Sequence, residues 1–132
     1  MIKGIIAGQF DLLHAGSILA LRDCKDHCDH LTVALHIDAS KQREGKAKPV
    51  QSVLERFIQL KACKFVDDII PYETEEDLTT ILLNGDFGVR FLGSDYLERK
   101  DITAEGAVPI KYLSRLHHYS STELKERIKK QK

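Results

Sequence analysis

Residues that could hold phosphate groups gather in two segments of the sequence, one near each end. The N-terminal segment, GQFDLLHAGS from Gly8 to Ser17, follows a short apolar run and leads into a stretch with helical periodicity. A glycine at the end of a strand lets the backbone approach a ligand closely. The helix that follows offers unpaired N–H groups and the positive end of its dipole, and His14 stands just before it. This segment predicts a phosphate site, although a purely structural role for His14 is the alternative.

The second segment, YLSRLHHYSST, leads into another stretch of helical periodicity near the C-terminus. Arg115 can hold phosphate oxygens in its planar fork. The hydroxyl and N–H groups of Ser120, Ser121 and Thr122 can hold further phosphate oxygens at the positive end of a helix dipole. The alternative is an ordinary helix cap, because Ser120 and Glu123 have the spacing of a capping box. Both interpretations can hold, since one hydroxyl can cap while the others bind.

These two segments need a scaffold that brings them together, and the hydrophobic pattern predicts one. Short apolar runs typical of buried parallel strands alternate with longer stretches of helical periodicity. The predicted strands are Ile2–Ala7, Leu31–His36, Asp68–Pro71, Val89–Leu92 and Pro109–Leu113, and the predicted helices are Ala15–Cys28, Ser52–Cys63, Glu75–Asn84 and Ser120–Lys130. With right-handed crossovers, this alternation predicts an α/β fold, a Rossmann-like doubly wound parallel five-stranded sheet with helices on both faces. Such sheets bind ligands where the strand order reverses, so we expect the site in the loops after the first, fourth and fifth strands.

The N-terminal segment resembles the signature of the nucleotidyltransferase superfamily that contains glycerol-3-phosphate cytidylyltransferase. In that family a strand leads into G-x-F-D-x-x-H-x-G-H, and this chain matches every fixed position except the last, where Ser17 replaces histidine. The family's two histidines hold the nucleotide phosphates and stabilise charge as the α-phosphate is attacked. The resemblance implies this catalytic role for His14. It also implies nucleotide contacts from the rest of the segment, namely Gly8, Gln9, Phe10, Gly16 and Ser17.

The C-terminal segment resembles the same family, which has a strand, an arginine, a short loop and hydroxyl residues at a helix N-terminus. This implies that Arg115 is catalytic and binds the nucleotide together with the three hydroxyl residues 120–122. The segment Gly93-Ser94-Asp95-Tyr96 resembles the family's Gly-x-Asp-aromatic segment beside the nucleotide, which implies nucleotide contacts from Gly93 and Asp95.

Isolated basic residues between these segments also match the family, although each alone is the kind of residue found on a solvated surface. Lys46 and Lys48 stand in a loop where the family places lysines that contact phosphates. From the resemblance we expect Lys46 to take part in catalysis and Lys48 to bind the acceptor. Arg56 stands where the family has an arginine near the acceptor, and Asp11 is assigned to acceptor binding as well.

The resemblance implies a CTP-dependent enzyme that transfers CMP to a phosphorylated polyol, sugar or amino alcohol and releases pyrophosphate, with Mg²⁺ bound to the triphosphate. No metal ligand is assigned to the protein. An adenylyltransferase that uses ATP stays open, although pantetheine-phosphate adenylyltransferases usually have proline where Leu12 stands here. A second alternative is a non-catalytic nucleotide-binding or regulatory module that lost turnover with the second histidine.

The substitution at position 17 is the main departure from the family. A serine hydroxyl can donate a hydrogen bond but cannot carry positive charge. Losing one such donor typically costs about 10²–10³ in rate when nothing replaces it. His117 and His118 lie in the loop between Arg115 and Ser120, so one of them could supply the missing charge. Two solvent-exposed rings without this role are the alternative.

Composition limits the remaining function classes. Twenty Lys and Arg balance twenty Asp and Glu, so the chain lacks the global basic field that would attract nucleic acid. The N-terminal apolar run is too short for a membrane span or a secretion signal, which predicts a cytoplasmic protein. The length and the absence of a linker predict a single nucleotidyltransferase domain over residues 1–132. From the family we expect a homodimer.

Three cysteines, Cys24, Cys28 and Cys63, are too few and too irregularly spaced for the disulfide framework of a secreted scaffold. Cys24 and Cys28, with His27 and His30 nearby, could suggest a metal site. They also continue a helical apolar pattern, and they lack the paired spacing of zinc ligands. We therefore expect Cys24 and Cys28 to pack in the core.

Overall fold

The computed structural model describes residues 1–42, 44–97, 102–114 and 119–131, with only the backbone described at Asp95. The chain folds into alternating strands and helices. In order they are β1 (Lys3–Gly8), α1 (Ala15–Asp26), β2 (His30–His36), η1 (Ala39–Lys41), α2 (Val53–Lys61), β3 (Asp68–Tyr72), α3 (Glu75–Asn84), β4 (Val89–Gly93), η2 (Ser94–Tyr96), β5 (Ile110–Leu113) and α4 (Ser121–Lys130).

The five strands form one sheet in the order β3-β2-β1-β4-β5, and every neighbouring pair is parallel. Strand β1 is central: Ile6 lies opposite Val33 of β2 on one side and Phe91 of β4 on the other. The chain leaves β1 toward β2 and later returns to place β4 on the other side of β1, so the strand order reverses between β1 and β4. This confirms the predicted Rossmann-like doubly wound parallel sheet.

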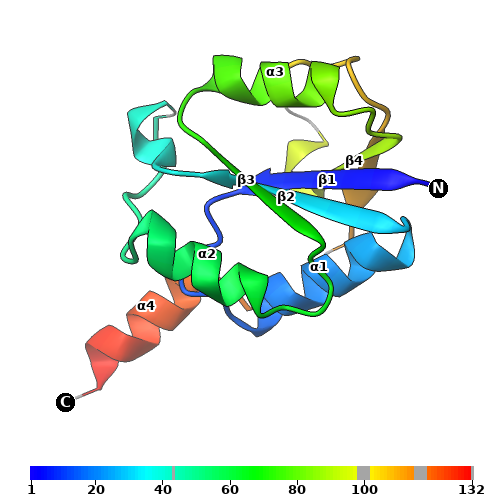
Figure 1. Ribbon diagram of the computed structural model, residues 1–132. Coiled ribbons are helices and arrows are strands. Elements are labelled where there is room, and N and C mark those ends of the chain that lie inside the picture. The colour runs from blue at the N-terminus through cyan, green and yellow to red at the C-terminus, as the bar shows by residue number, and fades with distance from the viewer. Residues whose placement is uncertain (43, 98–101, 115–118, 132) are drawn as a thin grey trace.

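Helices cover both faces of the sheet, as predicted (Figure 1). Helices α1 and α2 pack on one face, where Leu21 and Cys24 of α1 and Leu60 of α2 join a buried cluster with residues of the strands. Helix α3 covers the other face through Leu78 and Leu82. Successive residues of a strand point to opposite faces, so Ile5 belongs to the α3 cluster and Ile6 to the α1–α2 cluster. Helix α4 projects away from these layers near the C-terminus (Figure 1).

Local sequence accounts for where the helices begin. Ser52 before α2 and Thr74 before α3 each form a capping box, with Glu55 and Asp77 returning a hydrogen bond to the backbone of the cap. The hydroxyl of Ser120 accepts from the N–H of Glu123 at the start of α4, which is the first half of the predicted capping box. The carboxylate of Glu123 forms a salt bridge with Arg127 one turn further along α4.

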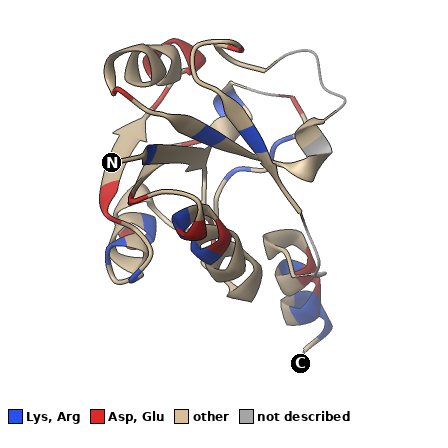
Figure 2. Cartoon of the chain, turned by 90° about the vertical axis from the view of Figure 1, so that its right-hand side faces the viewer, with Lys and Arg blue, Asp and Glu red and all other residues tan. Residues whose placement is uncertain are grey.

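The observed boundaries differ from the predicted ones by a few residues at most. Helix α1 ends at Asp26, so Cys28 lies beyond it. The edge position of β3 explains how Pro71 can stand inside a strand, because an edge strand does not need every N–H group for pairing. Neither short helix, η1 or η2, was predicted. Acidic and basic residues both occur in α1, α2 and α4, whereas α3 carries acidic residues only (Figure 2).

The prediction that Cys24 and Cys28 pack in the core is confirmed. Cys24 is fully buried in the α1–α2 cluster, and Cys28 packs against the same cluster. Burial raises the pKa of the Cys24 thiol, so this residue behaves as a small apolar side chain. All three cysteines are free.

Candidate active site

The loop between β1 and α1 contains the motif segment GQFDLLH, and its backbone is strained. Phe10 and Leu12 both have a φ of 51°. This left-handed region disfavours residues with a side chain, and each such residue costs on the order of 1–3 kcal/mol. Gly8 precedes them, and a Cβ atom at Gly8 would lie 3.2 Å from the ring of Phe10. A side chain at position 8 would therefore be tight against the ring of Phe10, which would have to shift by a few tenths of an ångström.

The segment before α2 holds this loop in place through Asp11. The carboxylate of Asp11 accepts hydrogen bonds from the N–H groups of Val50 and Gln51, at 2.8 and 3.0 Å. It also forms a salt bridge with Lys125 of α4, with 3.3 Å between Oδ2 and Nζ. Burial by itself would raise the pKa of Asp11, but the two N–H donors and the Lys125 ammonium together hold that pKa below its ordinary value. Asp11 thus joins three separate parts of the chain.

Arg56 of α2 completes this attachment. It is 1% exposed, and its guanidinium donates to the backbone carbonyls of Gln9, His36 and Ile37 at 3.0, 2.7 and 2.6 Å. Its Nε also donates to Gln51 and Ser52 in the turn before α2. The arrangement makes Arg56 a positioning residue that fixes the ends of β1 and β2. It gives no support to the predicted contact between Arg56 and an acceptor.

His14 is the N-cap residue of α1. Its Nδ1 accepts hydrogen bonds from the N–H groups of Gly16 and Ser17, at 3.1 and 3.4 Å. A nitrogen that accepts two hydrogen bonds carries no proton, so the proton of the neutral ring is on Nε2. His14 therefore has the structural role considered from the sequence, and the same ring reaches the cavities described next.

Two cavities open at the carboxyl ends of the strands, on either side of His14. The inner cavity has a volume of about 340 Å³ and lies over the ends of β1 and β2, with Gly8, Gln9 and Lys46 in its wall. The outer cavity has a volume of about 720 Å³ and lies beside α1 and the ends of β4 and β5, with Gly16, Gly93 and Ser120 in its wall.

The two cavities share a wall made by Phe10, His14, Ser17 and Ser121. This wall combines the N-terminal ends of α1 and α4, which are far apart in the sequence. His14 accepts from the N–H groups of Gly16 and Ser17 in α1, and Ser120 accepts from that of Glu123 in α4. Both helix ends still direct the positive end of a dipole at this wall, which suits phosphate. The predicted meeting of the two motif segments at one edge of the sheet is thus observed.

Most of the predicted site residues that the structure describes line these cavities, but some do not. Lys48, Arg56 and Thr122 line neither of the two. Gln9 also has a structural role, because its side-chain amide accepts from the N–H of Ala39 at 2.8 Å and donates to the carbonyl of Ala47 at 3.3 Å. The predictions for Arg115, His117 and His118, and for the side chain of Asp95, lie outside the described part of the structure.

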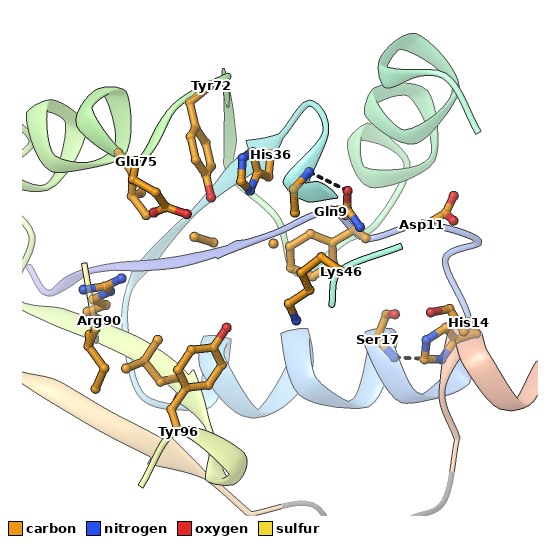
Figure 3. Close-up of a pocket in the computed structure, with 18 residues that line it drawn as sticks. Gln9, Asp11, His14, Ser17, His36, Lys46, Tyr72, Glu75, Arg90 and Tyr96 are labelled. Carbon is orange, nitrogen blue, oxygen red and sulfur yellow. Dashed lines mark hydrogen bonds between the residues drawn. The ribbon is translucent and has the colours of Figure 1, made fainter. Parts of the chain in front are cut away.

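The inner cavity also contains polar residues that no motif marked. Figure 3 shows His36, Tyr72, Glu75 and Arg90 of this kind, together with Tyr96, the aromatic residue of the Gly-x-Asp-aromatic segment. They belong to β2, β3, α3, β4 and η2, so they come from five elements. One sequence signal was available, because Arg90 interrupts the otherwise apolar run of β4. In the structure Arg90 is 4% exposed. A buried arginine in a strand needs a polar partner or a ligand.

The described residues were also searched for metal sites and for membrane-spanning helices. Among the residues with described positions, no group of three or more His, Cys, Asp or Glu could hold a metal ion. A search of the same residues for membrane spans found no helix with the length and apolar character needed to cross a bilayer.

Comparison with known proteins agrees with this geometry. A family model described as cytidylyltransferase-like matches residues 5–127. Glycerol-3-phosphate cytidylyltransferase of Bacillus subtilis (strain 168) is 31% identical, over 97% of this chain and 98% of that protein. The probable ethanolamine-phosphate cytidylyltransferase of Encephalitozoon cuniculi (strain GB-M1) is 40% identical over 49% of this chain, and the bifunctional protein HldE of Hyphomonas neptunium (strain ATCC 15444) is 35% identical over 77% of this chain.

This chain spans only 21% of the length of each of the latter two proteins. Among solved structures, the lipopolysaccharide core biosynthesis protein from Thermoplasma volcanium GSS1 superposes with a TM-score of 0.68, covering 91% of this chain and 99% of that one at 24% identity. At that identity the superposition shows the shared fold. The family match over residues 5–127 and the relative that is similar over nearly its whole length show more: the chain belongs to the cytidylyltransferase-like family of nucleotidyltransferases.

Proposed function

We propose that this chain transfers CMP from CTP to the phosphate group of a phosphorylated polyol, sugar or amino alcohol, with release of pyrophosphate. The observation that carries the proposal is the wall shared by the two cavities, where His14, Ser17 and Ser121 lie between them. Two substrates that occupy neighbouring cavities can meet at such a wall without diffusing through solvent. The names of the relatives with full-length or partial similarity support the same class of reaction.

In this proposal the outer cavity holds the nucleoside and the inner cavity holds the acceptor. Gly93 and Ser120, which the sequence assigned to the nucleotide, line the outer cavity. Lys46, which the sequence assigned to the reacting phosphates, lines the inner one. The triphosphate then lies along the shared wall, over the N-terminal ends of α1 and α4.

The reaction is one displacement at the α-phosphorus. An oxygen of the acceptor phosphate attacks that atom and forms a new P–O bond, while the bond between the α-phosphorus and the oxygen that leads to the β-phosphorus breaks. Pyrophosphate leaves with the electron pair of the broken bond. Such transfers depend on positioning and on positive charge more than on a covalent nucleophile. Nε2–H of His14 donates to a phosphate oxygen, and Lys46 and Arg115 supply charge.

Mg²⁺ accompanies the triphosphate in this proposal. The ion prefers oxygen ligands in octahedral geometry and is usually bound through substrate phosphates and water, with few protein ligands. Asp11, an acidic residue of the inner cavity, is already bonded to Val50, Gln51 and Lys125, so it is poorly suited to ligate a metal. The bonded state of Asp11 therefore fits a Mg²⁺ ion that is held mainly by the oxygens of the nucleotide. When bound, Mg²⁺ neutralises part of the triphosphate charge.

We also propose that the protein acts in the cytoplasm, as a homodimer. The three free cysteines suit a reducing compartment, where thiols stay reduced. Sedimentation equilibrium tests the dimer, and a mass equal to that of one chain across the accessible concentration range rules it out.

The function is tested by incubating the purified chain with CTP, ATP or GTP, Mg²⁺ and a panel of phosphorylated alcohols, and by measuring pyrophosphate release and the mass of the product. The expected result is release with CTP that depends on one class of acceptor. Release with ATP alone assigns the chain to the adenylyltransferases instead. Binding of CTP in a calorimeter without pyrophosphate release for any acceptor supports the non-catalytic module. If no nucleoside triphosphate binds at millimolar concentration, the proposal fails.

A further inference from the structure

Helix α4 turns one face toward the rest of the molecule. Ser121, Leu124 and Lys125 are half-buried, whereas the other residues of α4 are exposed. Residues three and four positions apart lie on the same side of a helix, so these three form one face. Ser121 lines both cavities, and Lys125 follows about 6 Å further along the helix axis. Because a helix is stiff over one turn, a contact that holds Lys125 also holds Ser121 in the shared wall.

Lys125 makes a salt bridge that joins this face to another part of the chain. Its Nζ lies 3.3 Å from Oδ2 of Asp11, in the loop after β1. The other salt bridges of α4 between described residues stay within the helix, and they join Arg127 to Glu123 and Lys129 to Glu126. Lys125 itself is in the wall of neither cavity. Its ammonium group is therefore placed to hold α4, and not to touch a substrate.

Asp11 is a fixed partner for this contact. Its side chain is 5% exposed, and its carboxylate also accepts from the N–H groups of Val50 and Gln51. The next residue of the loop, Leu12, donates its N–H to the side-chain oxygen of Gln51 at 2.8 Å. A salt bridge between two mobile surface side chains contributes little, because both must be immobilised. Here the carboxylate is already immobilised, so only the lysine side chain has to be ordered.

The loop that contains Asp11 also leads to the residues that face Ser121 across the shared wall. Asp11, His14 and Ser17 lie at the same side of the inner cavity (Figure 3). His14 caps α1, so the loop and the N-terminal end of α1 are one connected unit. The salt bridge between Lys125 and Asp11 thus fixes the N-terminal end of α4 relative to that of α1.

We propose that Lys125 is a positioning residue for the nucleotide, and that it acts through its salt bridge with Asp11. This salt bridge holds the N-terminal end of α4, with Ser121, in the shared wall. A triphosphate then meets the ends of α1 and α4 in a fixed arrangement, so less conformational freedom is lost on binding. The inference rests on the proposed function, because it takes the shared wall as the place of the triphosphate.

The first test compares three single variants of α4. Calorimetry measures the affinity for CTP and for inorganic tripolyphosphate, which has the phosphate chain without the nucleoside, both with Mg²⁺. Lys125→Met should lower both affinities by about tenfold or more, the effect of losing one hydrogen bond to a charged group. Lys125→Arg should stay within about threefold of the wild type, because a guanidinium pairs with a carboxylate as well. Lys129→Met removes the same charge from the exposed side of α4 and should change neither affinity.

The second test asks whether Lys125 acts through Asp11. Asp11→Asn removes the negative charge and keeps a side-chain oxygen that can accept from an N–H group. In the Asp11→Asn background, Lys125→Met should change both affinities by less than about twofold, because the contact that it removes is already lost. A lysine that bound the phosphates directly, or attracted them only by its charge, would lose the same affinity in both backgrounds.

The third test measures turnover at saturating CTP, with an acceptor that supports pyrophosphate release. Lys125→Met should lower kcat by about 10- to 100-fold, since a small displacement of the groups around the reacting phosphate slows the transfer strongly. Lys125→Arg should restore most of this loss. A loss of stability alone would lower neither kcat nor affinity while the variant stays folded, and urea denaturation checks that it does.

The outcomes separate this inference from the proposed function. Turnover by the wild type with unchanged affinity in Lys125→Met leaves the transfer reaction intact and overturns the inference. An equal loss of affinity in both Asp11 backgrounds also overturns it. If no acceptor supports turnover, but the affinity for tripolyphosphate depends on Lys125 only while Asp11 is present, the transfer reaction fails and the inference stands. If neither CTP nor tripolyphosphate binds to the wild type, the inference fails as well.

Discussion

At the scale of single residues, His14 has a structural role at one ring nitrogen and a proposed chemical role at the other. Nδ1 accepts from the N–H groups of Gly16 and Ser17 and caps α1. This fixes the orientation of the ring and places the proton on Nε2. A substitution that removes the whole side chain therefore mixes a stability effect with a catalytic one.

Asparagine and alanine at position 14 separate the two roles. His14→Asn keeps a good N-cap, since an amide oxygen can accept from the same N–H groups. We expect it to lose about 100- to 1,000-fold in kcat with little change in the free energy of unfolding. His14→Ala should lose the same activity and also about 0.5–2 kcal/mol of stability. Steady-state kinetics and urea denaturation measure the two effects, and near-normal turnover of His14→Asn would exclude the catalytic role.

Ser17 lies in the wall shared by both cavities, so the family's missing histidine would stand where the two substrates meet. The departure from the motif therefore lies at the proposed reaction centre. A hydroxyl there cannot offset the charge that gathers on the α-phosphate and the leaving pyrophosphate.

Compensation by His117 or His118 is tested with combined variants. We expect the double change His117→Ala, His118→Ala to lower turnover by about 100-fold or more, the typical loss for one charge-stabilising donor. Adding Ser17→His to that background should restore part of the activity. If the double variant turns over as fast as the wild type, neither loop histidine compensates. If Ser17→His activates a wild-type chain that is otherwise silent, the non-catalytic interpretation is correct.

At the scale of elements, the strained loop after β1 depends on contacts made by α2. Phe10 and Leu12 hold a disfavoured backbone conformation that the loop alone would not keep. Asp11 and Arg56 fix it from the outside through hydrogen bonds to the segment before α2 and to the ends of β1 and β2. The packing of α2 thus determines the shape of the inner cavity, although α2 contributes no side chain to its described wall.

Removing Arg56 should expose this dependence. Arg56→Met leaves carbonyl groups of Gln9, His36 and Ile37 without their donor, and buried unsatisfied groups cost about 1–3 kcal/mol each. We expect a loss of about 3 kcal/mol or more in the free energy of unfolding, measured by urea denaturation. The control is Lys61→Met on the exposed side of the same helix, which should change stability by less than about 0.5 kcal/mol. Equal stability of the two variants would contradict the positioning role.

The lowered pKa of Asp11 predicts a dependence on acid. A carboxyl group whose pKa is lower in the folded state stabilises the fold above its ordinary pKa, and this contribution is lost as the pH falls through the lowered value. The free energy of unfolding of the wild type should exceed that of Asp11→Asn by about 1–3 kcal/mol near neutral pH. The difference should shrink below about pH 4. Lys125→Met keeps the two N–H donors to Asp11, so it should lose only part of this free energy of unfolding. A difference between the wild type and Asp11→Asn that does not depend on pH would argue against the stabilising role of the Asp11 carboxylate.

At the scale of the whole molecule, the site joins the two ends of the chain. The shared wall takes Phe10, His14 and Ser17 from the N-terminal part and Ser121 from α4. All ten residues of α4 are described and none is buried. The helix is therefore attached through few contacts, of which the Lys125–Asp11 salt bridge is one. A triphosphate at the shared wall would add a link between α4 and the sheet.

This arrangement predicts that nucleotide binding stabilises α4 in particular. Elements with few buried contacts exchange their amide hydrogens through low-energy local openings, and a ligand that bridges them to the core suppresses those openings. Saturating CTP with Mg²⁺ should slow exchange in the first turns of α4 by about tenfold or more, measured by mass spectrometry. Helix α2 is capped and packed on the core and serves as the internal reference. Equal protection of α2 and α4 would place the nucleotide elsewhere.

The sequence by itself determined the elements and brought out the two segments proposed to bind phosphate. Strand runs, helical periodicity and caps such as Ser52 and Thr74 depend on residues within a few positions of one another, so they can be predicted locally. The position of the site also followed, because a parallel alternating fold brings the loops after β1, β4 and β5 to one edge of the sheet. His14, which the N-terminal motif singled out, lines both cavities at that edge.

Only the tertiary structure decided the role of Arg56 and the composition of the inner cavity's polar wall. The carbonyl acceptors of Arg56 on Gln9, His36 and Ile37 lie 19 to 47 positions away in the sequence. The wall of the inner cavity draws Tyr72, Glu75 and Arg90 from three elements that meet through strand order and helix packing. No local motif records such a meeting, because burial and hydrogen bonding between distant segments depend on how the whole chain packs.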